Sequence, residues 1–145
     1  AINRQNTLPF NIKIMENFTT KFVELAKQLV SEIKATTGIN KAGVSHANGL
    51  VADGKVIKSS SWNPPSAAEE NTYIDKNGMA AYGKWFLGID SNADAETKQH
   101  WHYIFTSDFV NVDRAALIAI RQRAGQQKQT DVFDAAGKMI EKIDA

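Results

Sequence analysis

Two histidines in the chain have a spacing that suits metal binding. His100 and His102 stand two positions apart in a segment with strand-like alternation, so both imidazoles would point to one side, as two ligands of a zinc or nickel ion do. Further ligands would have to come from His46 or from carboxylates elsewhere in the chain. Polar positions beside a buried Trp101 account for the pair more simply. We therefore expect no metal site.

Other catalytic patterns are equally incomplete. Ser45 and His46 are adjacent, but neighbouring residues rarely bring a hydroxyl onto the next ring, and neither a Gly-x-Ser-x-Gly turn nor an orienting acid accompanies them. The glycines are scattered, and none opens a helix with the spacing of a phosphate-binding loop. The carboxylates form no evident acid and base pair. We expect no catalytic residue, no cofactor-binding residue and no enzyme activity.

Charge and composition limit the classes of partner. The chain has 17 basic and 16 acidic residues, so it lacks the net charge typical of proteins that bind nucleic acid or membrane surfaces. Arg121 and Arg123 nevertheless give one predicted helix a basic edge, and we take both as candidate partner contacts. No stretch reaches the roughly 18 consecutive apolar residues of a membrane-spanning helix. We expect protein partners, no membrane contact, and nucleic acid only as an alternative.

The first part of the chain is predicted to form an arm and a helix. Residues 1–11 show no periodicity and contain Leu8, Pro9 and Phe10, a composition typical of an extended segment that orders on binding. These three residues are further candidate partner contacts. Residues 15–36 carry apolar side chains every three or four positions, which predicts one long amphipathic helix.

A small antiparallel sheet is predicted in the middle of the chain. Asp53 and Gly54 separate two short apolar runs within residues 49–57, and an Asp-Gly pair favours a tight hairpin turn. Alternating aromatic and aliphatic side chains predict two more paired strands, over residues 85–89 and 101–105. The sheet is thus expected to consist of hairpins.

Three helices are predicted around this sheet. Ser66 stands three positions before a glutamate, the order of a helix-capping box. Asp113 is expected to open a second helix that ends near Gly125, and Thr130 or Asp131 to cap a third. The last two helices form a predicted helical hairpin. The fold class is therefore α+β, with a long N-terminal helix, a small antiparallel sheet of hairpins and a C-terminal helical hairpin.

One pattern of residue types extends from Trp62 to the end of the sequence given. Its members are Trp62, Ser-Ala-Ala at 66–68, Tyr-Gly-Lys-Trp-Phe-Leu-Gly-Ile-Asp at 82–90, Trp-His-Tyr-Ile-Phe at 101–105 and Asn-Val-Asp-Arg-Ala-Ala-Leu at 111–117. The pattern resembles a small domain of head-morphogenesis proteins of tailed bacteriophages. In those proteins the domain is found beside, or fused to, prohead proteases and other capsid-region proteins.

The resemblance implies a non-enzymatic virion protein, head-associated or capsid-decorating, that is made in the bacterial host cytoplasm and acts by protein–protein contacts. Its partners would be capsid or other head proteins, in a homo-oligomer or a larger assembly. The alternatives are an assembly-protease or hydrolase subunit and a nucleic-acid-binding accessory protein. We expect residues 1–145 to form one domain, with an arm at 1–11, a helix and hairpin at 12–61, and the phage-head-like α+β region at 62–145.

Overall fold

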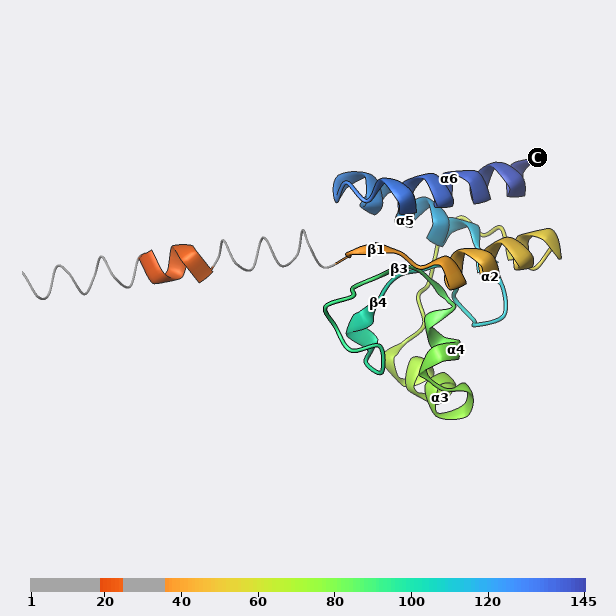
Figure 1. Ribbon diagram of the computed structural model, residues 1–145. Coiled ribbons are helices and arrows are strands. Elements are labelled where there is room, and N and C mark those ends of the chain that lie inside the picture. Colours follow the sequence, from red (N-terminus) through yellow and green to blue (C-terminus); the bar gives the residue numbers. More distant parts are fainter. Residues whose placement is uncertain (1–18, 25–35) are drawn as a thin grey trace, which may run out of the picture. The chain divides into compact units, whose positions relative to one another are not determined.

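The computed structural model describes residues 19–24 and 36–145. It divides the chain into two compact units, Ala1–Ala35 and Thr36–Ala145. In the first unit, residues 19–24 are helical. The second unit holds the sheets and the remaining described helices (Figure 1). Within the described residues, no helix is both long and apolar enough to cross a membrane.

Several sequence predictions fall on the N-terminal unit. The extended arm at residues 1–11, with its candidate contacts Leu8, Pro9 and Phe10, lies outside the described residues. Most of the long helix predicted over residues 15–36 also lies outside them. These predictions therefore stay predictions.

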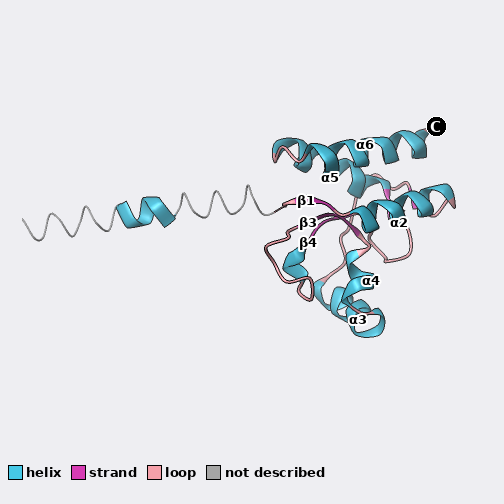
Figure 2. Ribbon diagram, viewed as in Figure 1, coloured by secondary structure: helices cyan, strands magenta, loops and turns pink. Residues whose placement is uncertain are grey.

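A three-stranded antiparallel sheet forms the centre of the second unit (Figure 2). Its strands follow the order β1 (Gly38–Ile39), β3 (Phe86–Ile89) and β4 (Trp101–Ile104). β3 and β4 pair with Phe86 opposite Ile104, which confirms the hairpin predicted from the aromatic alternation. The second unit is thus a mixture of helices and a small antiparallel sheet, in agreement with the α+β prediction.

The hairpin predicted within residues 49–57 is wrong. Residues up to Ala52 belong to helix α2 (Lys41–Ala52), and Asp53 is its C-cap. Gly54 has a φ of +73°, and the N–H groups of Gly54 and Lys55 donate to carbonyls of the last helical turn at 3.1 and 2.9 Å. This is a Schellman ending, in which a left-handed glycine closes a helix. The same Asp-Gly preference for positive φ therefore terminates a helix here and does not reverse a strand.

A second, parallel strand pair was not predicted. β2 (Val56–Ile57) follows α2 and pairs in parallel with β5 (Val112–Asp113), far along the chain. Val112 and Asp113 are both buried. Parallel strands need a long crossover between them. The residues from β2 to β5 provide it, so this pair ties the chain before Trp62 to the residues after it.

The predicted helices of the C-terminal half are present. α3 (Ala67–Asn77) begins with the capping box, because the Glu69 N–H donates to Ser66 Oγ at 3.1 Å. α4 (Met79–Gly83) follows, and η1 (Lys98–His100) is a short 3-10 helix before β4. Asp113 caps α5 (Arg114–Gln126), as predicted. α6 (Thr130–Asp144) packs against α5 and completes the helical hairpin.

The cap predicted for the last helix is wrong. Neither Thr130 nor Asp131 is the N-cap, since Thr130 is already helical and Gln129 has the non-helical backbone that precedes the first turn. The Gln129 side chain donates to the Thr36 carbonyl at 3.0 Å. A tertiary contact therefore holds the start of α6 in place of a local hydroxyl or carboxylate cap.

The sheet is covered on both sides. α5 and α6 lie on one side and α3 and α4 on the other, while α2 packs against β3 and α6 (Figure 1). The largest fully buried apolar side chains come from α4, from the strands and the residue after β4, and from α5 and α6, namely Tyr82, Leu87, Phe105, Val112, Leu117, Val132 and Met139. One continuous core therefore runs through the second unit.

A buried asparagine fixes α2 on the sheet. The Asn40 side-chain amide donates to the carbonyls of Gly83 and Phe86 at 2.8 and 2.9 Å. Gly43, in the first turn of α2, packs so closely that a Cβ atom would lie 1.7 Å from the Phe86 carbonyl oxygen. The absence of a side chain at Gly43 thus allows the helix to cross directly over β3.

Candidate partner-binding site

The structure separates the two arginines that the sequence singled out. Arg121 and Arg123 are both exposed on α5. The Arg121 guanidinium carbon lies 4.6 Å from the centre of the Phe133 ring, a cation–π contact that holds it against α6. Arg123 instead lines a pocket of about 130 Å³, which we call the Arg123 pocket. Arg123 therefore belongs to a concave site, whereas Arg121 packs on a ring of the neighbouring helix.

The Arg123 pocket is lined mainly by apolar side chains from four segments. These are Trp62, Phe86, Tyr103, Ile104, Ala119, Ile120 and Arg123. Phe86, Tyr103 and Ile120 are buried, so the walls belong to the core and are preformed. Arg123 supplies the charge. The pocket thus combines an apolar interior with one guanidinium.

Trp62 reaches this pocket from an irregular segment between β2 and α3. Its indole N–H donates to the Thr106 carbonyl at 3.3 Å, and Ser66 caps α3 four residues later. The hydrogen bond therefore anchors the Trp62 ring, and the start of α3 holds the backbone shortly after it. Trp62 is recognisable in the sequence but the pocket is not, because its other walls lie far away in the sequence.

Tyr103 lines the same pocket in an unusual backbone conformation. Its φ is +66°, although it lies in β4. The ring covers Gly88, where a Cβ atom would lie 2.9 Å from Tyr103 Cδ2. The expected strict alternation over residues 101–105 is therefore interrupted at this position. A positive φ at a bulky residue stores strain, and such residues concentrate at functional sites.

The Tyr103 hydroxyl remains a hydrogen-bond donor in this environment. Burial raises the pKa of Tyr103, against smaller opposing effects of a hydrogen bond with Thr36 and of the positive charge of Arg123. The hydroxyl donates to Gln127 Oε1 at the end of α5. Because this hydroxyl stays neutral, the guanidinium of Arg123 is the only charged group among the described side chains that line the pocket.

The size and charge of the Arg123 pocket define what it can hold. A cavity of ~150 Å³ accommodates a benzene-sized group, so about 130 Å³ suits one medium apolar side chain. A guanidinium pairs most strongly with a carboxylate, often through two hydrogen bonds. The arrangement therefore fits a segment with an apolar side chain beside a carboxylate.

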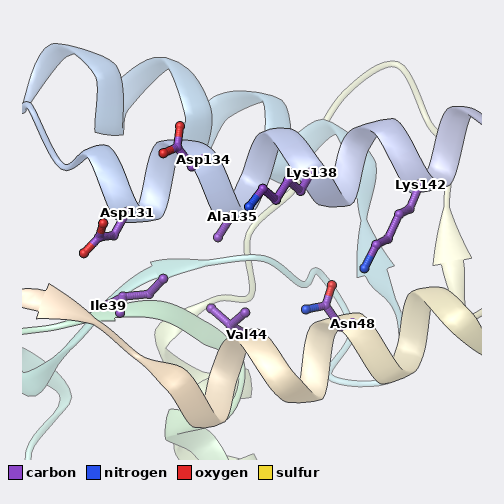
Figure 3. Close-up of a pocket in the computed structure, with 8 residues that line it drawn as sticks. All are labelled: Ile39, Val44, Asn48, Asp131, Asp134, Ala135, Lys138 and Lys142. Carbon is purple, nitrogen blue, oxygen red and sulfur yellow. The ribbon is translucent and has the colours of Figure 1, made fainter.

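A second depression lies between α2 and α6, and we call it the α2–α6 groove (Figure 3). It has a volume of about 380 Å³. Ile39, Val44 and Ala135 give it apolar walls, and Asn48 lies on the α2 side. Its charged residues all come from α6 and are Asp131, Asp134, Lys138 and Lys142.

A third depression of about 500 Å³ lies between α3 and the loop of residues 108–110. Phe109 stacks on Tyr73 at 4.3 Å and has a φ of +55°. Its N–H donates to Thr106 Oγ1 at 3.0 Å, and Asp108 accepts from the N–H of Val110 at 2.9 Å. The side-chain oxygens of Thr106 and Asp108 therefore hold this loop in its shape.

The histidines do not form the pair that their spacing suggested. His100 is the last residue of η1 and precedes the strand, and its Nδ1 lies 2.8 Å from the Ala93 carbonyl. His102 Nε2 lies 3.0 Å from the Gln99 carbonyl. Across the described residues, no three His, Asp or Glu side chains come close enough together to hold a metal ion.

His46 lies apart from these histidines, on α2. Its ring contacts the Trp85 ring edge-on, with centroids 4.6 Å apart. Burial lowers the pKa of His46, and the nearby positive charge of Lys84 lowers it further. The neutral imidazole is thus the form that this packing favours.

The chain was compared with protein-family models, with curated proteins and with solved structures, and none of them matches. Function must therefore be inferred from the residue pattern, the fold and the chemistry of the depressions.

Proposed function

We propose that this chain is a non-enzymatic structural protein of a tailed-phage virion, head-associated or capsid-decorating, and that it acts by protein–protein contacts. It would be made in the bacterial host cytoplasm and bind capsid or other head proteins. The contact would use the Arg123 pocket, which takes an apolar side chain that lies beside a carboxylate on the head protein.

One observation carries this proposal. Trp62 opens the residue pattern that resembles the phage head domain, and Arg123 was selected independently as a partner contact from its place on a basic helix edge. Both side chains line the same preformed pocket. Apolar anchors that fill preformed pockets, with arginine among the favoured residues, are typical of the strongest contacts in protein interfaces.

The N-terminal predictions belong to the same proposal. A long helix over residues 15–36 would follow the arm of residues 1–11, and Leu8, Pro9 and Phe10 of the arm would supply a second, extended contact with the particle. An arm and a pocket on one chain would increase binding through multivalency.

The experiment is co-sedimentation of the full chain with head particles from the phage that encodes it. We expect the parent chain to sediment with the particles. Arg123→Glu should lower the affinity about tenfold or more, because it places a negative charge where a carboxylate binds. Lys55→Glu is the matched control, since Lys55 is exposed and lies outside the pocket.

Three results would contradict the proposal. The first is that the parent chain stays in the supernatant. The second is that Lys55→Glu weakens binding as much as Arg123→Glu does, and the third is that both variants bind like the parent. The genes beside the coding sequence provide an independent check. We expect them to encode a portal protein, a prohead protease and a major capsid protein.

A further inference from the structure

The charged residues of the α2–α6 groove are ordered along α6. Figure 3 shows Asp131 and Asp134 toward the start of the helix and Lys138 and Lys142 toward its end. All four side chains are exposed. The spacings of three or four residues place them on one face of the helix. The face is therefore acidic over one half and basic over the other.

Contacts within the chain account for only part of this pattern. Asp131 and Lys142 suit the partial charges at the two ends of α6, and Asp134 and Lys138 have the spacing of a favourable pair within a helix. However, Asp131 with Asp134 and Lys138 with Lys142 are like-charged neighbours at three and four residues, which destabilises a helix. The two ion pairs of the described residues, Lys98 with Glu70 and Arg114 with Asp144, involve none of the four.

The charge pattern on α6 is complementary to itself when α6 of a second copy runs antiparallel to it. Asp131 then faces Lys142 of the second copy, and Asp134 faces Lys138 of the second copy. The acids are three residues apart and the lysines four, which differ by only ~1.5 Å along a helix axis. A lysine side chain easily spans such a difference. A two-fold axis repeats both pairs, so the interface would contain four ion pairs.

The apolar part of the groove suits the same arrangement. Ala135 lies near the middle of the charged face, and its small side chain allows close approach of a second helix. Ile39 and Val44 flank it and are both half-buried, so they have apolar surface left to cover. A partner of a single charge sign would be repelled by one half of the face, whereas a second copy meets both halves with the opposite charge.

We propose that the α2–α6 groove is a self-association surface, in which a second copy of this chain docks with α6 antiparallel to α6 about a two-fold axis. Such an interface is isologous, because each surface patch binds the same patch on the other copy. This inference does not depend on the Arg123 pocket. The Arg123→Glu variant should therefore form the same dimer as the parent chain.

Sedimentation of the full chain over a concentration series tests the inference. We expect a reversible monomer–dimer equilibrium that weakens as salt is raised, since the pairs are exposed to solvent. An all-acidic face, made by Lys138→Asp with Lys142→Asp, should weaken dimerisation about tenfold or more. An all-basic face, made by Asp131→Lys with Asp134→Lys, should do the same. An equimolar mixture of the two variants should recover the dimer.

A matched variant separates this specific pairing from general charge attraction. Lys55→Asp with Lys76→Asp has the same net charge as the all-acidic variant, but its changes lie at exposed lysines outside the groove. It should not form a heterodimer with the all-basic variant. If a reversed face affects folding, Lys138→Gln with Lys142→Gln should weaken the dimer in the same direction.

The inference would be overturned if the parent chain is monomeric at all concentrations, or if the all-acidic variant dimerises like the parent. Equal association of the all-basic variant with the all-acidic variant and with the Lys55 and Lys76 variant would also overturn it.

Discussion

The two sides of the central sheet are stabilised in different ways. On the side of α5 and α6, aliphatic side chains at helical spacing fill the interface, including Leu117, Val132, Met139 and Ile143. On the side of α3 and α4, aromatic rings interlock and are joined by side-chain hydrogen bonds. The Trp85 indole donates to the Tyr73 hydroxyl at 3.0 Å, and the Tyr82 hydroxyl donates to Glu70.

This difference predicts how each side responds to substitution. An aliphatic interface depends mainly on filled volume, so a residue of similar size can replace another at little cost. A buried hydrogen bond depends on one donor and one acceptor, and loss of either leaves the other unsatisfied. The α5–α6 side should therefore tolerate isosteric changes that the aromatic α3–α4 side does not.

The largest effect is expected at Trp85, which is 4% exposed and contacts Phe105, Phe109 and His46. Trp85→Ala should lower the free energy of unfolding by about 3–5 kcal/mol, because it opens a large cavity and leaves the Tyr73 hydroxyl without its partner. Chemical denaturation measures this change. Trp101→Ala should cost less, since Trp101 is only half-buried. Parent-like unfolding of the Trp85 variant would mean that the aromatic side contributes little to the core.

On the α5–α6 side, Met139 is fully buried. Met139→Ala should lower the free energy of unfolding by about 2–5 kcal/mol, whereas Met139→Leu should lower it by less than about 1.5 kcal/mol. Denaturant titration of the two variants gives both values. If leucine proves as harmful as alanine, this side depends on specific shape and the contrast between the two sides fails.

Tyr73→Phe is the corresponding isosteric change on the aromatic side. It removes only the hydroxyl that accepts from the Trp85 indole, and the ring can still stack on Phe109. We expect a loss of about 1–2 kcal/mol, because the indole N–H is left without a partner. A double variant with Trp85→Phe isolates the pair by a double-mutant cycle. Coupling near zero would show that the hydrogen bond does not stabilise this side.

The smallest effect is a pH dependence from His46. Its pKa lies below the usual value, so the folded state favours the neutral ring. The contribution of the neutral His46 ring to the free energy of unfolding is present above about pH 6.5 and is lost as the pH falls through the lowered folded-state pKa. Between about pH 7.5 and about pH 5, the parent should lose more stability than His46→Gln. Equal losses in urea titrations at the two values would show that His46 is not the cause.

The sequence predicted the parts of this fold that depend on periodicity and local capping. The helical hairpin, the paired strands and the Ser66 capping box follow from residues within one turn or one strand of each other. The Asp53 and Gly54 pair was misassigned because positive φ suits both a hairpin turn and a helix end. Here the residues before Asp53 are helical and pack on β3, so the pair closes a helix.

The candidate site was only partly predictable for a related reason. Arg123 and Trp62 were selected from composition and pattern, but they are about 60 residues apart in sequence. The unusual φ of Tyr103 has no local sequence signal, since glycine or asparagine normally marks such a position. It arises where the ring packs on Gly88 of the neighbouring strand. Contacts between distant segments created the pocket, and single-sequence periodicity does not contain them.

The most direct test of the proposed function is to fill the Arg123 pocket without changing charge. Ala119 lines the pocket, and Ala115 lies one turn earlier on α5, half-buried and outside it. Ala119→Leu should leave the fold intact and lower co-sedimentation with head particles about tenfold or more, because the added side chain occupies the space of the partner's anchor. Ala115→Leu should sediment like the parent. Equal binding of Ala119→Leu and the parent chain would contradict the account.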